Sequence, residues 1–268
     1  MTAGAASVLA WHWRGGRWAR ATRALPDEVP VALSYDGTTQ AVMMATPADL
    51  EDFGLGFTLT EGIATPSEVE DLAVAEVPGG LDVQITLAEG AGARLAARRR
   101  RMAGPVGCGL CGLDSIAAVL GEVPAVPGGV SLTPGQVTEA MALLPAGQAL
   151  HDATRAVHAA GFYVPGRGIV ALREDVGRHN ALDKLAGALR GEGAAGAVVL
   201  TCRVSIDMVQ KAARLGAGVV IAASAPTAHA VRLAEGAGIT LVGLARGDGF
   251  AVFTHPGRLS GEEKADVA

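Results

Sequence analysis

Apolar and polar residues alternate in the first third of the chain, which is the pattern of half-buried β-strands. Segments 29–33 and 40–45 flank an Asp36-Gly37 pair, a combination that predicts a β-hairpin. Segment 83–87 alternates in the same way and predicts a further strand. The first twenty or so residues show no clear period, so we expect a weakly ordered arm with at most one strand there.

Three Thr-Pro pairs carry a helix-start signal, in which a threonine N-cap precedes proline at the first helical position. The threonines are Thr46, Thr65 and Thr133, and we expect a helix to begin after each. Between residues 88 and 111 the pattern gives way to Gly, Ala and Arg, which predicts a long loop. Loops of that length in compact domains are usually functional or disordered.

The second half of the chain changes to a regular alternation of short apolar segments and helical patterns. A hairpin is predicted first, from segments 162–164 and 169–172. Predicted helices at 179–189, 205–215 and 227–234 then alternate with predicted strands at 197–201, 219–223, 240–244 and 250–254. This order predicts an α/β fold whose largely parallel sheet is covered by helices.

The predicted elements divide the chain into three parts. Residues 1–24 form the N-terminal arm, and residues 25–104 form a smaller N-terminal α+β region that ends in a flexible, Arg-rich loop. Residues 105–268 hold a Cys-x-x-Cys loop and the larger α/β domain, a mixed sheet with flanking helices.

Composition and charge narrow the class of protein. Half of the 268 residues are hydrophobic, which suits a substantial core, but no apolar run approaches the roughly 18 to 20 residues of a membrane helix. A net charge of −5 argues against general nucleic-acid binding. With three cysteines and no positively charged segment of a signal peptide, we expect a cytoplasmic protein.

Cys108 and Cys111 form the Cys-x-x-Cys motif, and four arginines, at 98–101, precede them. Nearby cations favour the thiolate, which is the reactive form of cysteine, and flanking glycines keep the sulfurs on an open backbone. Sulfur transfer or redox chemistry is therefore one interpretation. Half of a zinc site, or two ordinary buried thiols, are the others that the motif leaves open.

A second polar cluster lies where a predicted strand gives way to a helix, around Arg178, His179 and Asn180. Free backbone N–H groups and the helix dipole favour an anion at such a place. His179 with Asp183, and Asn180 with Lys184, are spaced to share one helix face. The alternative is a helix cap followed by a solvated face. The clustering of three such residues at one helix start favours an anion site.

Similar strand ends follow along the chain. Arg203 and Ser205 come after one predicted strand and Thr227 after the next, where α/β sheets commonly meet ligands. Cys202 continues an apolar strand and is predicted to be a small buried residue. Arg258, after the last strand, is a further candidate cation for a phosphate, or a residue of a solvated turn.

Taken together, these segments resemble the FdhD family, the formate dehydrogenase accessory sulfurtransferases. The resemblance spans nearly the whole chain. It rests on segments 50–53, 56–57, 60–63, 108–112, 174–184, 203–205, 208–214, 224–227 and 254–256.

The resemblance implies a protein that carries sulfur from a cysteine desulfurase to the molybdenum cofactor, Mo-bis(molybdopterin guanine dinucleotide), before that cofactor enters formate dehydrogenase. It also implies a homodimer, a cytidine-deaminase-like larger domain, and no metal bound directly by the protein. Cys108 would hold the persulfide and Cys111 would assist or relay it. The family's cofactor-binding stretch falls on Phe250, Ala251, Val252, Phe253, Thr254 and His255.

Two positions depart from the family pattern: Cys202 stands where Gly or Ser is more usual, and Asp207 where Glu is usual. Two other functions compete with the sulfur carrier. A zinc-dependent deaminase is one, but its His-x-Glu half is missing upstream of Cys108. The other is a chaperone that holds the molybdenum cofactor without moving sulfur, since the same anion site would serve it.

Overall fold

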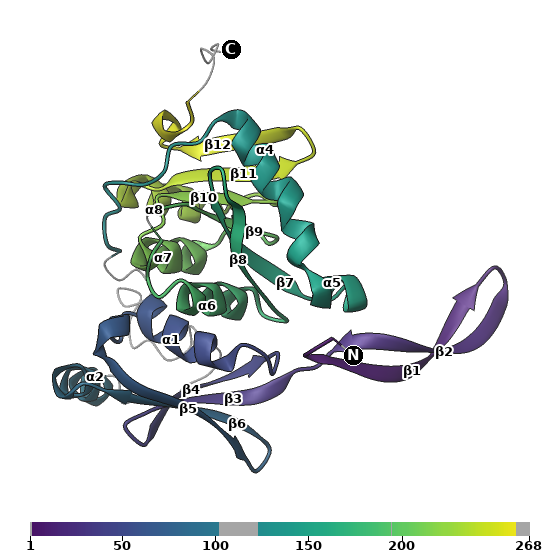
Figure 1. Ribbon diagram of the computed structural model, residues 1–268, viewed down its shortest axis with the longest axis horizontal. Coiled ribbons are helices and arrows are strands. Elements are labelled where there is room, and N and C mark those ends of the chain that lie inside the picture. Colours follow the sequence, from purple (N-terminus) through teal and green to yellow (C-terminus); the bar gives the residue numbers. More distant parts are fainter. Residues whose placement is uncertain (1, 102–122, 194, 261–268) are drawn as a thin grey trace.

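The computed structural model describes residues 2–101, 123–193 and 195–260, and these form three parts (Figure 1). A long N-terminal hairpin projects from the body of the molecule. A smaller domain is built on a four-stranded sheet, and a larger domain on a six-stranded sheet. This arrangement confirms the predicted α/β class, with a mixed sheet, flanking helices and a smaller α+β domain.

The hairpin consists of β1 (Ala5–Arg14) and β2 (Arg17–Pro26), joined by Gly15 and Gly16. Both glycines have positive φ, as the tight turn of a hairpin requires. The sequence predicts at most one strand here. The register is fixed by pairing across the hairpin, residue by residue from Ala5 opposite Pro26 to Arg14 opposite Arg17, which a search for periodicity within one strand does not detect.

The smaller domain is a sheet in the order β4-β3-β6-β5. Its strands are β3 (Val29–Tyr35), β4 (Thr38–Ala45), β5 (Val69–Val77) and β6 (Gly80–Leu87). Helix α1 (Leu50–Thr60) covers one face of this sheet with Phe53 and Phe57, and a short 3-10 helix, Pro66–Glu68, leads into β5. The predicted hairpin around Asp36-Gly37 is confirmed as β3 and β4.

Helix α2 (Glu89–Arg101) begins where the sequence predicts a long loop. Alanine, leucine and arginine are strong helix formers, and their propensity outweighs the two glycines in this helix. Ala91 and Leu95, four residues apart, are buried against the smaller domain. The prediction of a loop is therefore wrong for residues 89–101, and the remainder of the predicted loop lies outside the described residues.

The larger domain is a mixed sheet in the order β12-β11-β10-β9-β7-β8. Strands β9, β10 and β11 run parallel to one another, and β7 and β12 run against their neighbours. The strands are β7 (His158–Val164), β8 (Gly168–Asp175), β9 (Ala197–Leu200), β10 (Val219–Ala222), β11 (Thr240–Arg246) and β12 (Gly249–Thr254).

Helices cover both faces of this sheet. One face holds α6 (Arg178–Ala188), α7 (Ile206–Leu215) and α8 (Ala228–Ala237). The other face holds α4 (Pro134–Leu143), whose predicted N-cap Thr133 accepts a hydrogen bond from the Gln136 amide. The remaining short helices are Leu144–Gly147, α5 (Ala149–Thr154) and Pro256–Arg258.

The two domains meet where α1 packs against α6 (Figure 1). Gly56 of α1 and Gly187 of α6 allow this contact, because a β-carbon at Gly56 would overlap the Asp183 carbonyl and one at Gly187 would overlap the Asp52 carbonyl. Two helices can approach so closely only where side chains are missing.

Thr46 belongs to this domain interface and does not cap a helix as predicted. Helix α1 begins later, at Leu50, and its N-cap is Asp49. The Thr46 amide donates to Asp175 Oδ2 at 3.0 Å, and its hydroxyl accepts from the Val176 amide at 3.2 Å. These partners lie about 130 residues along the chain, so tertiary hydrogen bonds override the local capping signal.

Candidate functional site

The carboxyl edge of the larger sheet gathers the polar residues that the sequence singled out. Strand β8 ends next to Arg178 and His179, and β9 is followed by Cys202, Arg203 and Ser205. Strand β7 runs in the opposite direction, so its first residue lies at the same edge. We call this group the strand-end cluster; its members are His158, Arg178, His179, Cys202, Arg203, Ser205 and Asp207.

His179 and Asp207 form the central pair of the strand-end cluster. His179 Nε2 lies 3.1 Å from Asp207 Oδ2, and the Ser205 hydroxyl donates to the same oxygen at 3.1 Å. The hydrogen bond from His179 holds the pKa of Asp207 below its ordinary value of 3.8, against the opposing effect of burial. Asp207 is therefore an anion at neutral pH, and it orients both the imidazole and the hydroxyl.

Arg178 supplies the positive charge at the centre of the cluster. Its Nε is buried and makes no hydrogen bond in the described part of the chain. Burial, and then the charge of Arg178, lower the pKa of His158, so that His158 is neutral at pH 7. A buried guanidinium N–H without a partner is costly, and an anionic ligand at this edge would satisfy it.

Cys202 is buried, as predicted, and belongs to the hydrophobic core of the larger domain. Burial raises the pKa of its thiol, although the charges of Arg178 and Arg203 oppose that shift. A buried thiol of raised pKa is inert, so Cys202 takes no part as a nucleophile.

Two helices begin at this edge without a capping side chain. Gly177 is the N-cap of α6. Ser205 is the N-cap of α7, but its hydroxyl donates to the Asp207 side chain and accepts no hydrogen bond from a backbone amide of the helix. Their dipoles add to the charges of Arg178 and exposed Arg203. The strand-end cluster can therefore hold a phosphate or a similar anion.

Asn180 and its neighbours on α6 serve the domain interface. The Asn180 amide donates to Met44 O and to Asp175 Oδ1, and the residue is buried. Lys184 pairs with Asp175 at 2.7 Å, and Asp183 pairs with Lys211 at 2.8 Å. The pairs expected along the helix face, His179 with Asp183 and Asn180 with Lys184, do not form, because these side chains bind partners on other elements. Asn180 is therefore not part of the strand-end cluster.

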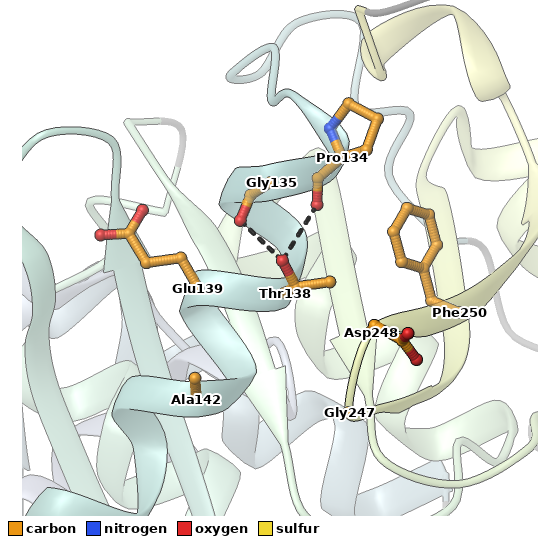
Figure 2. A pocket seen from close by; sticks show the side chains of 8 residues that line it. All are labelled: Pro134, Gly135, Thr138, Glu139, Ala142, Gly247, Asp248 and Phe250. Atoms are coloured by element: carbon orange, nitrogen blue, oxygen red, sulfur yellow. Dashed lines mark hydrogen bonds between the residues drawn. The ribbon is translucent and has the colours of Figure 1, made fainter.

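The stretch Phe250–His255 lies apart from the strand-end cluster. All of it but His255 belongs to β12, which is separated from β9 by β11 and β10. Phe250 lines a groove of about 530 Å³ between α4 and the turn before β12 (Figure 2). Glu139 and Asp248 also line this groove, and its described lining includes no basic residue, so a phosphate is disfavoured there.

Burial, together with the hydrogen bond that Tyr163 donates to Glu139 at 2.6 Å, raises the pKa of Tyr163 to about 12. Glu139 is thus held as an acceptor at the side of this groove.

The last residues of the predicted cofactor stretch have structural partners. The Thr254 hydroxyl donates to Ile239 O at 2.7 Å, and His255 Nε2 lies 2.8 Å from Glu235 O. Arg258 donates to three backbone carbonyls, those of Gly238, Val126 and Gly128, so its guanidinium holds a loop in place. This edge of the sheet is opposite to that of the strand-end cluster, because β12 runs against β11.

Cys108 and Cys111, predicted to carry the sulfur chemistry, lie outside the described residues, and their roles stay predictions. Sequence reasoning missed two members of the strand-end cluster, His158 and Asp207. His158 begins a strand and shows no local motif, and Asp207 reaches His179 from a different helix. Only the fold brings these residues together. Within the described part of the chain, no helix is long and apolar enough to cross a membrane.

Comparisons with known proteins all match this chain to one protein family. The model of the FdhD/NarQ family matches residues 26–260. A curated relative from Agrobacterium fabrum, "Sulfur carrier protein FdhD", is 52% identical over 251 residues, covering 92% of this chain and 93% of the relative. A protein of the same name from Cupriavidus necator is 48% identical over 256 residues, covering 94% of this chain and 88% of the relative.

The fold has a solved counterpart as well. The crystal structure of a putative formate dehydrogenase accessory protein from Desulfotalea psychrophila superposes with a TM-score of 0.74 at 24% identity, covering 96% of this chain and 99% of that one. A match to the family model over most of the chain, together with relatives at about half identity, settles the family. This chain belongs to the FdhD/NarQ family.

Proposed function

We propose that this protein carries sulfur on Cys108 from a cysteine desulfurase to Mo-bis(molybdopterin guanine dinucleotide), which then enters a formate dehydrogenase. The family match over residues 26–260 carries this proposal, together with relatives that are named sulfur carrier proteins. The chain keeps the Cys-x-x-Cys pair that such chemistry needs. We further propose that it works in the cytoplasm, as a homodimer.

The proposed chemistry is thiol exchange followed by release of the terminal sulfur. The Cys108 thiolate attacks the outer sulfur of the desulfurase persulfide, the donor S–S bond breaks, and the donor leaves as a thiolate. Delivery as sulfide needs two electrons. Cys111 supplies them when its thiolate attacks Cys108 Sγ, which forms a Cys108–Cys111 disulfide and releases the outer sulfur as HS⁻ for the cofactor. Two equivalents of an external thiol then reduce this disulfide to the two thiols, and the external thiol is oxidised to its own disulfide.

The strand-end cluster is the proposed site for the phosphates of the cofactor. Arg178 offers a buried N–H without a partner, and two uncapped helix starts add their dipoles. The acidic groove beside Phe250 suits a group that donates hydrogen bonds, such as the edge of a guanine base, better than it suits a phosphate.

Two variants test the proposal with separate readouts. Cys108→Ala should abolish activation of the client enzyme and leave binding of GDP, a soluble fragment of the cofactor, unchanged. Arg178→Gln should weaken GDP binding by about 10-fold to 150-fold, the cost of one charge-assisted hydrogen bond, and still accept sulfur.

Arg167→Gln is the matched control, because it removes the same charge at the exposed turn between β7 and β8, the far end of that hairpin. A Cys108→Ala variant that activates its client normally would support the second candidate function, a chaperone that holds the cofactor without moving sulfur.

A further inference from the structure

All three tryptophans of the chain lie on one exposed face of the N-terminal hairpin. Trp11 and Trp13 follow each other on β1, and Trp18 stands opposite Trp13 with ring centroids 5.2 Å apart. Their exposed fractions are 64%, 60% and 64%. Arg20 stacks on Trp11, and Leu9 extends the same face. We call these five residues the aromatic face.

No other element of the described part of the chain covers the aromatic face. Among the described residues, the hairpin projects past α5 and contacts the body near its base (Figure 1), where Arg23 donates to Thr154 O. Tryptophan is normally among the more buried residues, and large exposed apolar patches mark interaction surfaces. An isolated two-stranded hairpin is also only marginally stable in water. Both facts indicate that another surface covers the aromatic face.

The distribution of charge along the chain indicates which surface covers the aromatic face. The hairpin carries four arginines and no acidic residue, so its formal charge is +4. The remaining 18 basic residues of the chain stand against 27 acidic ones, a net charge of −9. A second copy of this chain therefore offers the hairpin a body of opposite charge.

A groove on the smaller domain provides an acidic place for the hairpin tip. It encloses about 380 Å³ and is lined by Val74 and by the segment from Pro47 to Asp52. Arg173 pairs with Asp52 at 2.6 Å and lies 3.6 Å from Asp49, so part of the negative charge is neutralised. Glu51 is exposed and has no ion pair within the described residues.

The groove and the base of the hairpin are neighbours. Gly4, which precedes β1, packs against Thr46, which precedes the groove segment: a β-carbon on Gly4 would come within 2.5 Å of Thr46 Cγ2. Because the hairpin starts beside the groove and points away from it, a two-fold axis near the middle of the hairpin would carry each tip to the groove of the other copy.

We propose that two copies of this chain exchange their hairpins, with Arg14 and Arg17 at each tip meeting Glu51 in the partner's groove. A ten-residue strand is about 33 Å long, so the two grooves lie roughly that far apart. Three indole side chains at this exposure present on the order of 400 Å² of accessible surface per hairpin. Two hairpins and the surfaces that cover them then bury about 1,600 Å², the size of a standard stable interface.

The first test uses the full chain and its own tryptophans. Since all three lie on the aromatic face, their fluorescence reports on the hairpin alone. Sedimentation equilibrium should give twice the chain mass of 27.0 kDa, and dilution should shift the emission to the red over the same concentrations at which the mass falls. A chain that stays monomeric, or an emission that does not change as a dimer dissociates, would overturn the proposal.

Variants on both sides of the contact complete the test. Trp11→Ser with Trp18→Ser should raise the dissociation constant at least thirtyfold, since exposed tryptophans at interfaces are typical hot spots, each worth about that factor. Glu51→Lys should also weaken the dimer, and it lies on the body, so a failure of the hairpin to fold cannot explain the result.

Glu192→Lys, an equal charge change in an exposed turn of the larger domain, should leave the dimer intact. Arg17→Glu should weaken the dimer, and its combination with Glu51→Arg should restore it. A dimer that survives Glu51→Lys, or that Arg17→Glu with Glu51→Arg does not restore, would refute docking in the groove. This inference rests on the proposed homodimer, but none of these outcomes depends on sulfur transfer, so the hairpin exchange and the sulfur-carrier function can fail separately.

Discussion

Lys184→Met should destabilise the protein severely, because Lys184 and Asp175 form a fully buried ion pair in the larger domain, where both also bind Thr46 of the smaller domain. Both side chains are 0% exposed, and Lys184 Nζ lies 2.7 Å from Asp175 Oδ2. Nζ also donates to Thr46 O at 2.8 Å. Methionine fills a similar volume but leaves the Asp175 carboxylate as an unpaired charge in the core.

Removing one partner of a buried pair usually costs about 3–5 kcal/mol. Asp175 keeps hydrogen bonds from the amides of Thr46 and Gly177 and from the Asn180 side chain, which places the expected loss near the lower end, about 3 kcal/mol. That is a large fraction of the 5–15 kcal/mol that holds a typical domain folded.

Urea unfolding followed by far-UV circular dichroism measures this loss. Tryptophan fluorescence would be misleading, because all three tryptophans lie on the hairpin and not in either core. Asp152→Asn is the control: its pair with Arg155 is exposed, with side chains 62% and 63% accessible, and should contribute less than about 1 kcal/mol. A loss below about 1 kcal/mol for Lys184→Met would refute the reasoning.

Three further predictions follow from single contacts. Gly56→Ala should cost about 3 kcal/mol in the free energy of unfolding, because the α6 backbone at Asp183 and Gly187 blocks a β-carbon, whereas Gly236→Ala on α8, with open space around it, should be neutral or stabilising by up to about 1 kcal/mol. His179→Ala should raise the pKa of Asp207 towards 3.8, as carbon NMR of the carboxyl group will show. The ion pair stabilises the fold above pH 3.8, and this stabilisation is lost as the pH falls through the lower pKa of folded Asp207. Acid unfolding of the variant should therefore begin at a higher pH than that of the unmodified protein. Cys202 should resist alkylation by iodoacetamide at pH 8 in the native protein and react once urea unfolds it, as peptide mass spectra will show.

The sequence predicts the larger domain well because its central strands are buried on both faces. Strands β9 and β10 consist of apolar residues throughout, and the predicted ranges agree with the structure to within one residue at each end. Buried parallel strands must be apolar, whatever their partners are, so local composition is enough to find them.

Two predictions from the sequence were wrong, because tertiary hydrogen bonds or helix propensity outweighed the local sequence pattern. Thr46 carries the pattern of a helix N-cap, but hydrogen bonds with Asp175 and Val176 hold it at the domain interface. The Arg-rich segment after residue 88 shows weak amphipathic patterning, yet alanine, leucine and arginine form α2.

Local sequence patterns predicted the residues of the candidate site that stand at helix starts, but not the pair that forms across two helices. Arg178, His179, Arg203 and Ser205 stand at helix starts, a local property. Asp207 could not be assigned as the partner of His179, because pairing across two helices depends on their packing. Spacing along one helix pointed to Asp183 instead, and that carboxylate pairs with Lys211.

The most direct test of the sulfur-carrier function is a mass spectrum of the purified protein after incubation with a cysteine desulfurase and cysteine. We expect one added sulfur on the peptide that contains Cys108, lost on treatment with a reductant. The Cys108→Ala protein should show no adduct. Unmodified thiols at both Cys108 and Cys111 in the presence of an active desulfurase would contradict the proposed function.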